Sequence, residues 1–369
     1  MVSNKKHILI SNTEIPSTKV GSWNNLLTNL LEIDKRFFDT IISPKPVNLI
    51  SGVSVFIKEP KNLFQKITSK LYPNYRKKVY WNALNKVMND SVGIYSISIF
   101  DNLKIVKAID YYAKKNNKRD RIEINFFLRG YTIDQNIENR ALIYNSIDKL
   151  IVQTYSSYKY QLENNHSIPC EVHVLPNGID SKIFFPVSFD QKVILRAQKK
   201  ISKNKKVFLW VSNNRKKKGL FLILKAWQKI TEKYTDIVLV IAGVPIGSII
   251  ENDSILNVGI KSNKELAPYY QLADYYLFSS LCHEGHPLSL TEAIKSGSKC
   301  LVSNISPNKE IIKNGEYGYL VQNPHILDSW INAISAVLEN NISFKEIKDL
   351  DNIYDFTIWM ENLRKILKD

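Results

Sequence analysis

Hydrophobic residues along the chain alternate between short apolar runs and longer amphipathic stretches. The first short run spans His7 to Ser11 and is followed by an amphipathic stretch from Trp23 to Ile33. A short apolar run bounded by polar residues is typical of a buried strand, whereas a longer amphipathic stretch is typical of a helix. The pattern therefore predicts a strand, a loop and a helix at the amino-terminal end.

The same alternation continues in two series. Strand-like runs of the first series lie at 40–42, 53–57, 92–97, 122–127 and 149–153, with helix-like segments at 102–115 and 136–145. Strand-like runs of the second lie at 207–211, 237–242, 275–279, 300–303 and 319–321, with helix-like segments at 220–234, 264–272, 289–296 and 326–339. Nearly continuous apolar strands that alternate with helices predict parallel sheets covered on both faces. The expected fold class is therefore α/β, with two such domains.

The chain between the two series is rich in prolines and polar residues, and the carboxyl-terminal segment from Tyr354 to Lys368 is amphipathic. One face of this segment carries Ile358, Leu363, Ile366 and Leu367, so it must pack on another part of the protein. We therefore divide the chain into an amino-terminal domain, 1–186, a second domain, 187–345, and a carboxyl-terminal helix, 346–369.

Composition agrees with two ordinary globular domains. The 369 residues are 44% apolar with 13 Gly and 13 Pro, which excludes collagen-like and low-complexity sequence. Cys170, Cys282 and Cys300 are odd in number and widely spaced, which favours neither a disulfide framework nor a zinc site and favours a reducing cytoplasm. The longest later apolar run, 237–250, is interrupted by Gly and Pro and is shorter than the roughly 20 residues of a membrane-spanning helix. We expect no transmembrane segment.

The net charge of +16 predicts an anionic partner. The excess is concentrated between Lys58 and Lys86, where eight Lys or Arg residues are opposed by one Glu. Tyr72, Tyr75, Tyr80 and Trp81 lie among these basic residues. Such a mixture suits the headgroup region of an anionic membrane, so we expect peripheral attachment there. The alternative is a solvated helical face whose aromatic residues belong to the core.

The segment from His283 to Ala293 follows an apolar strand and contains a Gly-His-Pro turn before a predicted helix. Ligands of open α/β sheets bind at the carboxyl ends of strands, and a helix amino terminus attracts anions. Glu284 lies in the turn and Glu292 lies further along the helix, so the two carboxylates can contact opposite ends of a sugar nucleotide. Taken alone, the segment is more typical of a helix cap with two ordinary surface glutamates.

This segment, E-G-H-P-L-S-L-T-E-A, resembles the signature of the retaining glycosyltransferase family 4, whose members have the GT-B fold. Further motifs resemble the family in the same order: V-L-P-N-G-I-D at 174–180, F-F-P at 184–186, K-G at 218–219, V-I-A-G at 240–243 and S-N-I-S-P-N-K-E-I-I at 303–312. The resemblance extends over about 151–367. It implies two Rossmann-like domains that face a cleft, with the carboxyl-terminal helix crossing back to the first domain.

The resemblance also implies how a donor is bound. Glu292 would accept hydrogen bonds from the ribose hydroxyls, and Glu284 would contact the hydroxyls of the donor sugar. The sugar and the diphosphate would be lined by Gly285, His286, Pro287, Leu288 and Ser289. Family members often carry Phe or Leu at the position of His286, so a packing role for this imidazole stays open.

Four further residues follow from the same resemblance. Arg215 and Lys218 would clamp the diphosphate and stabilise it as the leaving group, although any lysine of 216–218 could supply the second charge. Gly21 would let the backbone approach the donor phosphate. Arg129 stands where many relatives have His, and because a guanidinium cannot act as a base we expect it to bind an acceptor phosphate or the sugar.

The expected activity is therefore transfer of a hexose-type sugar from a nucleotide sugar, with UDP favoured, to a glycan or lipid-linked glycan in cell-surface polysaccharide or lipopolysaccharide synthesis. The single Asp-x-Asp, at 349–351, lies in a predicted linker, so we expect no metal and no cofactor. We expect a cytoplasmic protein, peripheral on the inner face of the membrane. Two alternatives stay open: a non-catalytic GT-B scaffold, and a basic nucleic-acid-binding protein, for which no binding signature is present.

Overall fold

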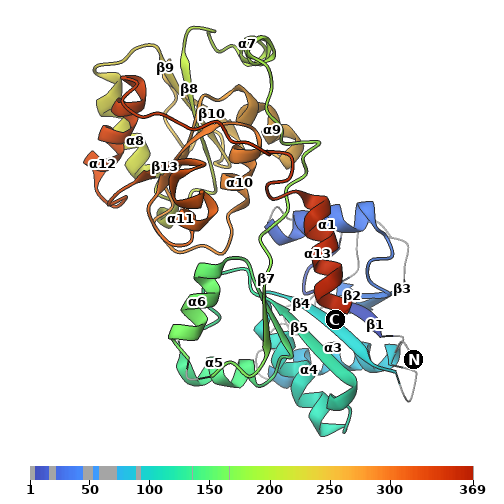
Figure 1. The fold of residues 1–369 in the computed structure, drawn as a ribbon. Coiled ribbons are helices and arrows are strands. Elements are labelled where there is room, and N and C mark those ends of the chain that lie inside the picture. Colours follow the sequence, from blue (N-terminus) through green and yellow to red (C-terminus); the bar gives the residue numbers. More distant parts are fainter. Residues whose placement is uncertain are drawn as a thin grey trace. The chain divides into compact units, whose positions relative to one another are not determined.

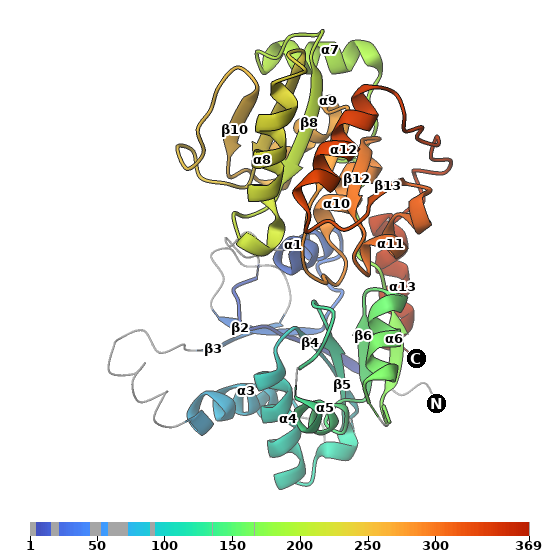
Figure 2. The same cartoon turned by 90° about the vertical axis from the view of Figure 1, so that its left-hand side faces the viewer.

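The computed structural model describes residues 5–15, 22–44, 53–57, 73–88, 93–134, 136–165 and 167–368. The chain forms two compact units. Unit 1 comprises Met1–Pro176 and Met360–Asp369, and unit 2 comprises Asn177–Trp359. Each unit contains a parallel sheet flanked by helices (Figures 1 and 2). The predicted α/β class with two domains is therefore confirmed.

Unit 1 is built on a seven-stranded parallel sheet with the order β3-β2-β1-β4-β5-β6-β7. The strands are β1 (Lys6–Ile10), β2 (Thr40–Pro44), β3 (Val53–Ile57), β4 (Tyr95–Phe100), β5 (Ile122–Phe127), β6 (Lys149–Val152) and β7 (Glu171–Val174). The order of the strands reverses between β1 and β4. In open α/β sheets such a reversal leaves a crevice at the carboxyl ends of the two strands, where ligands bind.

The helices of unit 1 are α1 (Ser22–Ile33), α3 (Pro73–Val87), α4 (Leu103–Lys115), α5 (Ile137–Tyr144) and α6 (Tyr155–Glu163). Asn102, Asn136 and Thr154 begin α4, α5 and α6, because each side chain accepts a hydrogen bond from a backbone N–H of the first turn. Strand β4 runs later than the predicted 92–97. Its serines, Ser96 and Ser98, alternate with buried isoleucines and interrupt the apolar run on which the prediction rested.

Most of the basic-aromatic segment between Lys58 and Lys86 lies outside the described residues. The described part of α3 shows Trp81 only 5% exposed and stacked on Tyr112, with ring centroids 6.3 Å apart. The interpretation of Trp81 as an interfacial aromatic residue was therefore wrong. It belongs to the core of unit 1, because helix α3 turns this face toward α4.

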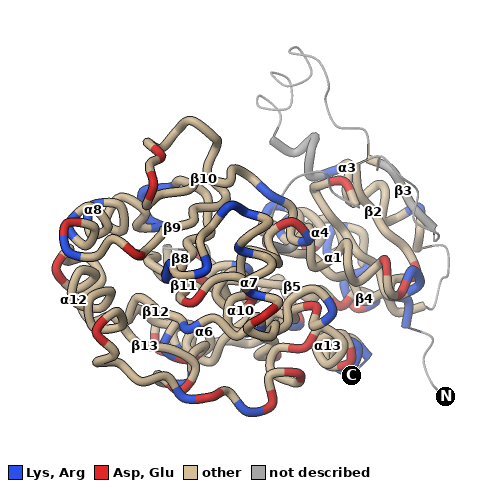
Figure 3. Tube along the Cα trace, turned by 90° about the horizontal axis from the view of Figure 1, so that it is seen from above, with Lys and Arg blue, Asp and Glu red and all other residues tan. Residues whose placement is uncertain are grey.

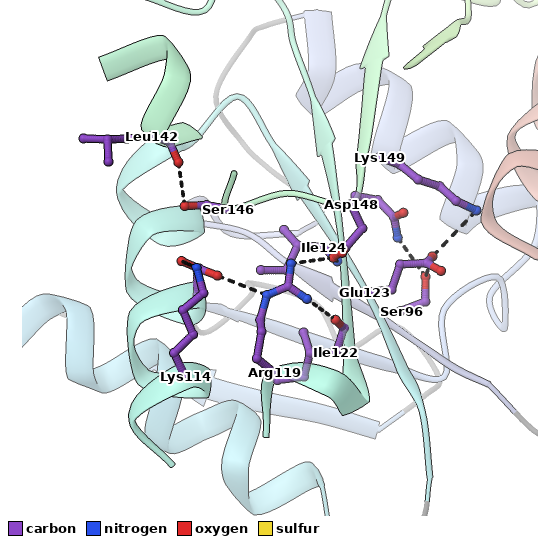
Figure 4. A network of polar contacts seen from close by, with 12 residues as sticks. Ser96, Lys114, Arg119, Ile122, Glu123, Ile124, Leu142, Ser146, Asp148 and Lys149 are labelled. Carbon is purple, nitrogen blue, oxygen red and sulfur yellow. Dashed lines mark hydrogen bonds and ion pairs between the residues drawn. The ribbon is translucent and has the colours of Figure 1, made fainter. Parts of the chain in front are cut away.

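A network of polar contacts holds the amino-terminal ends of the strands of unit 1 (Figure 4). Arg119 lies just before β5 and donates to Asp110 Oδ1 at 3.0 Å, to Asp148 Oδ2 at 2.8 Å and to the carbonyl of Ile122 at 2.6 Å. Glu123 of β5 pairs with Lys5, with 2.9 Å between Nζ and Oε2. The network therefore fixes the edge of the sheet opposite the carboxyl ends of the strands.

Unit 2 is built on a six-stranded parallel sheet with the order β10-β9-β8-β11-β12-β13. The strands are β8 (Lys206–Val211), β9 (Ile237–Ala242), β10 (Ile255–Gly259), β11 (Tyr275–Phe278), β12 (Lys299–Ser303) and β13 (Gly318–Val321). The helices are α7 (Phe189–Gln198), α8 (Leu220–Thr231), α9 (Asn263–Leu272), α10 (Leu288–Lys295), α11 (Asn308–Ile311) and α12 (Leu327–Leu338). Hydrophobic clusters cover both faces of the sheet. The order of strands reverses between β8 and β11.

The units divide after Pro176, whereas the predicted boundary followed residue 186. Ile179 and Phe184 are buried in the core of unit 2, which explains the difference. The last helix, α13 (Phe356–Lys368), begins in unit 2, and its residues from Met360 onward belong to unit 1. The residues before it also belong to unit 2, since Ile347, Leu350 and Ile353 pack on its core, so the predicted division at 345/346 differs as well.

Candidate functional site

The most polar loops of unit 2 follow β8 and β11, the two strands at the reversal of strand order. The first loop connects β8 to α8 and carries Arg215 and Lys218, and the second connects β11 to α10 and carries Glu284. Because all strands are parallel, both loops lie at the carboxyl edge of the sheet. The position matches the general ligand site of open α/β sheets.

Lys218 and Glu284 form an ion pair across these loops. Nζ of Lys218 lies 2.5 Å from Oε2 of Glu284, and the side chains are 16% and 17% exposed. The other carboxylate oxygen, Oε1, is buried and has no hydrogen-bond partner in the described part of the chain. A mostly buried pair attracts more strongly than an exposed one. A buried carboxylate oxygen without a hydrogen-bond donor is costly, and a ligand hydroxyl that reached it would remove this cost.

Main-chain contacts hold the two loops together. The Ser279 hydroxyl donates to the carbonyl of Lys218 at 2.9 Å, and the amide of Leu281 donates to the carbonyl of Lys217 at 2.7 Å. Gly219 has φ of 74°, and a Cβ atom there would lie 2.1 Å from the carbonyl oxygen of Ser279. Only glycine therefore fits between the loops, and its conformation directs Lys218 toward Glu284.

The structure distinguishes the basic residues of the first loop. Lys218 is the lysine that reaches Glu284, whereas Lys216 and Lys217 are exposed. Arg215 is also exposed, on the same side of the sheet but without the ion pair that holds Lys218. Sequence analysis left the choice among 216–218 open, because it depends on the turn at Gly219.

Helix α10 begins at the end of the second loop. Pro287 precedes its first residue and offers no side-chain cap, so the first backbone N–H groups, from Leu288 and Ser289, are not capped by it. Gly285 and Pro287 are buried in the turn. Free N–H groups and the positive end of the helix dipole favour an anion such as a diphosphate.

Glu292 lies in the second turn of α10 and is 4% exposed. The Tyr270 hydroxyl donates to its Oε2 at 2.9 Å, and the Asn263 side chain donates to its Oε1 at 3.4 Å. Burial raises the pKa of Glu292 to about 7, and the bond from Tyr270 opposes this shift. Glu292 is therefore a buried carboxyl with neutral partners, unlike the ion-paired Glu284.

His286 is 4% exposed, and the edge of its ring meets the face of Tyr354 with centroids 4.9 Å apart. Burial lowers the pKa of His286 to about 3, so the imidazole is neutral. Neither ring nitrogen has a hydrogen-bond partner within the described residues. Of the two roles left open, the geometry favours packing for the ring. The main-chain carbonyl of His286 accepts a hydrogen bond from Asn177 Nδ2 at 2.9 Å.

Asn177 was not among the predicted site residues, although it lies in the V-L-P-N-G-I-D motif. It is the first residue of unit 2, and the chain beside it pairs with the segment that returns to unit 1. Ile179 N–H donates to the Tyr354 carbonyl at 2.7 Å, and Phe356 N–H donates to the Ile179 carbonyl at 3.1 Å. Both connections between the units therefore meet the loop that carries Glu284.

The Asp-x-Asp segment, 349–351, contacts the last residue of α10 through its main chain. The carbonyls of Leu350 and Asp351 accept hydrogen bonds from Lys295 Nζ at 2.6 and 3.0 Å. Over the described ranges, no group of three or more His, Cys, Asp or Glu side chains is arranged to hold a metal ion. Metal independence stays a prediction.

In unit 1, Arg129 follows β5 and pairs with Asp101, which follows β4. Nη2 of Arg129 lies 2.9 Å from Oδ2 of Asp101. Sequence analysis missed Asp101, because a single Asp after a strand carries no recognisable pattern. Gly21 lies outside the described residues.

Charge and hydropathy add two observations. Lys and Arg are distributed over many elements together with Asp and Glu (Figure 3). None of the helices in the described ranges is long and apolar enough to cross a membrane.

The site in unit 2 lies within a segment with a known family model. Residues 191–352, most of unit 2, match the model described as "Glycosyl transferases group 1". Unit 2 is similar to this family over these residues. The match confirms the predicted resemblance and supports a glycosyltransferase that uses a nucleotide sugar.

Curated relatives point to the same class of enzyme. The N-acetyl-alpha-D-glucosaminyl L-malate synthase of Bacillus anthracis is 26% identical over 279 residues, which cover 71% of each chain. The UDP-Gal:alpha-D-GlcNAc-diphosphoundecaprenol alpha-1,3-galactosyltransferase of Escherichia coli is 27% identical over 223 residues, which cover 52% of this chain and 55% of the relative. This match spans only about half of the relative's length.

Solved structures show the same fold over nearly the whole chain. Anabaena Alr3699/HepE in complex with UDP-glucose is similar with a TM-score of 0.73 and 12% identity, covering 98% of this chain and 99% of that one. Sucrose-phosphate synthase from Thermosynechococcus elongatus has a TM-score of 0.70 and 16% identity, covering 99% and 95%. The predicted GT-B class is therefore confirmed.

Proposed function

We propose that the protein is a retaining glycosyltransferase that moves a hexose-type sugar from a UDP-sugar to a glycan or lipid-linked glycan. The observation that supports this best is the Lys218–Glu284 pair, 2.5 Å across, at the reversal of strand order in unit 2. It places a cation for the diphosphate beside a carboxylate with an unsatisfied oxygen for the sugar.

Each residue has a distinct role in this proposal. The diphosphate binds between Lys218, Arg215 and the amino terminus of α10, where positive charge and backbone N–H groups are available. Glu284 accepts hydrogen bonds from sugar hydroxyls, and Glu292 accepts them from the ribose. Gly285, His286, Pro287, Leu288 and Ser289 line the sugar and diphosphate through their backbone.

The reaction needs no covalent enzyme intermediate. The bond between the anomeric carbon and the β-phosphate oxygen breaks, and the acceptor oxygen bonds to the same face of that carbon. The acceptor proton passes to the departing phosphate oxygen, so the leaving UDP itself acts as the base. Negative charge grows on the diphosphate during this step, and its stabilisation by Lys218 and Arg215 lowers the barrier.

The choice of UDP and of a lipid-linked acceptor is supported by what the similar proteins are named for. The Escherichia coli relative is named for a UDP-sugar donor and a diphosphoundecaprenol acceptor, and the HepE structure contains UDP-glucose. We extend both to this chain, with a metal-independent reaction and a role in cell-surface polysaccharide synthesis. Peripheral attachment to the inner face of the membrane would bring such an acceptor within reach.

The test compares Lys218→Ala and Arg215→Ala with Lys217→Ala, an exposed neighbour in the same loop. Nucleotide sugars are first screened by thermal stabilisation, since a bound donor stabilises the folded state. We expect a UDP-sugar to stabilise the protein, and we expect turnover to fall about 10- to 100-fold in the first two variants, with little change in Lys217→Ala. Normal turnover in a variant lacking both Arg215 and Lys218 side chains would refute the clamp.

A further inference from the structure

We propose that Asp101 and Arg129 together form the acceptor-binding pair of unit 1, and that this pair selects the hydroxyl groups of a neutral pyranoside rather than a phosphate. The inference rests on the proposed function, because it names the chemical class of the acceptor for that transferase. It also chooses between the two ligands expected at Arg129, a phosphate and a sugar.

The first argument is the position of the pair in the sheet. The strand order of unit 1 reverses between β1 and β4, and Asp101 directly follows β4. Arg129 follows β5, which pairs with β4 in parallel register. Both side chains therefore start from the carboxyl edge of the sheet at its ligand-binding position. Unit 2 carries Lys218 and Glu284 at the equivalent reversal.

The backbone at Asp101 is held by contacts between the ends of β4 and β5. The Asp101 amide donates to the carbonyl of Phe127 at 2.9 Å, and the rings of Phe100 and Phe127 stack with centroids 4.0 Å apart. Asp101 has φ of 49°, a left-handed conformation that is uncommon for residues other than glycine and concentrates at functional sites. Helix α4 does not need Asp101 as a cap, because Asn102 caps the amide of Ile105 at 3.2 Å.

The second argument is the charge of the pair. The side chain of Asp101 is 30% exposed and that of Arg129 is 59% exposed, so neither side chain is enclosed by the protein. Burial raises the pKa of Asp101, and the nearby guanidinium opposes the shift. With one charge of each sign 2.9 Å apart, the pair is neutral overall, and a phosphate would meet the carboxylate as well as the guanidinium.

A sugar hydroxyl satisfies both members of the pair at once. It can donate a hydrogen bond to the carboxylate and accept one from the guanidinium, whereas an ionised phosphate oxygen can only accept and is repelled by the carboxylate. The adjacent strand β1 ends near two more neutral hydroxyl groups, those of Ser11 and Thr13, which bond to each other at 3.1 Å. The edge of the sheet is therefore suited to a polyol.

The experiment uses saturation-transfer NMR on the full chain with UDP present. The probes are the methyl α-glycosides of glucose, galactose and N-acetylglucosamine, with inorganic phosphate as the competitor. We expect at least one glycoside to receive saturation from the wild-type protein, and we expect phosphate not to displace it. Asp101→Asn should weaken glycoside binding about tenfold or more, since it removes a charged acceptor. It should also allow phosphate to bind at the freed Arg129.

Asp110→Asn is the matched control, because Asp110 pairs with Arg119 at 3.0 Å in the same unit but at the amino-terminal edge. It should leave glycoside binding unchanged. Circular dichroism checks that Asp101→Asn folds. If it does not, Asp101→Glu, which keeps the charge, takes its place. Asp101→Glu should retain part of the glycoside binding. Displacement of the glycoside by phosphate from wild type, unchanged binding in the Asp101 variant, or no binding of any glycoside would overturn the inference. Failure of every UDP-sugar to stabilise the protein would instead refute the proposed function.

Discussion

Two glutamates of one short segment have opposite surroundings. Glu284 is paired with Lys218, whereas Glu292 is enclosed with the neutral side chains of Tyr270 and Asn263. Burial without a cation disfavours the charged form of Glu292 and raises its pKa to about 7. The charge of this carboxyl is therefore costly until a ligand hydroxyl solvates it.

Glu292→Gln should change how stability depends on pH. The folded-state pKa of about 7 lies above the ordinary 4.5, so the folded protein keeps a proton that the unfolded chain has lost. The resulting destabilisation is absent below pH 4.5, grows between 4.5 and 7, and is complete above 7, where it amounts to about 3 kcal/mol. The glutamine variant does not lose this stability as the pH rises. Its free energy of unfolding relative to wild type should therefore rise with pH across that interval.

Chemical denaturation at several pH values measures this difference, and Glu346→Gln, at an exposed position, serves as the control. A constant difference between Glu292→Gln and wild type from pH 4.5 to 7 would contradict the assigned pKa shift. The same variant should bind a UDP-sugar more weakly, because the ribose loses a charged acceptor.

At the scale of elements, the site depends on the close approach of two loops rather than on the helices that follow them. The loop after β11 donates two hydrogen bonds to main-chain carbonyls of the loop after β8, one from the Ser279 hydroxyl and one from the Leu281 amide, beside Gly219. The next element, α8, begins at Leu220 directly beyond this contact. A change at Gly219 therefore affects the packing of α8 and the position of Lys218 together.

Gly219→Ala should destabilise the protein and reduce activity, because a Cβ atom would lie 2.1 Å from the Ser279 carbonyl oxygen and φ is 74°. Gly247→Ala is the matched control, since Gly247 has φ of 80° but a Cβ atom there would have no other atom within 4 Å. Gly247→Ala should lower the free energy of unfolding only by the cost of alanine in a left-handed conformation, about 1 kcal/mol. Gly219→Ala should lower it by at least about 2 kcal/mol more. Equal losses in thermal unfolding would show that the loops separate without cost.

At the scale of the whole molecule, the last helix belongs to both units. Residues of α13 from Met360 onward are part of unit 1, where Arg364 pairs with Asp34 and the carbonyl of Ile366 accepts a hydrogen bond from Lys149 at 2.8 Å. The chain end thus contributes to the core of the unit with which the chain begins. Stability of unit 1 therefore depends on residues at both ends of the sequence.

Leu363→Ala should weaken unit 1 although it lies near the carboxyl end. Leu363 is fully buried, so truncation should cost about 2 to 5 kcal/mol. Hydrogen exchange should show faster exchange in β1, β4 and β5 with little change in unit 2. Ile334→Ala, at an equally buried position of α12, should produce the reverse pattern. Faster exchange confined to unit 2 in Leu363→Ala would contradict the assignment of this helix.

The sequence by itself determined where most strands and helices lie and that they form two series. Nearly every predicted apolar run is an observed strand, because burial on both faces of a parallel sheet requires continuous apolar residues, and this requirement is local. The strands that the pattern missed, β7 and β10, are short edge strands with polar residues such as Glu171 and Asn257. The segment from Glu284 to Glu292 was also recognisable, since its spacing lies within one turn and one helix.

Only the tertiary structure decided which side chains meet. Lys218 pairs with Glu284 and Asp101 pairs with Arg129 because strands adjacent in the sheet bring distant loops to one edge. Asn177, the first residue of unit 2, donates a hydrogen bond to the carbonyl of His286, and no local pattern records any of these relations. Trp81 shows the same limit for packing, because an aromatic residue among lysines has the same sequence whether it faces a membrane or, as here, the core. The hydrophobicity of a residue can be read from the sequence, but the groups that its side chain contacts are decided by the tertiary fold.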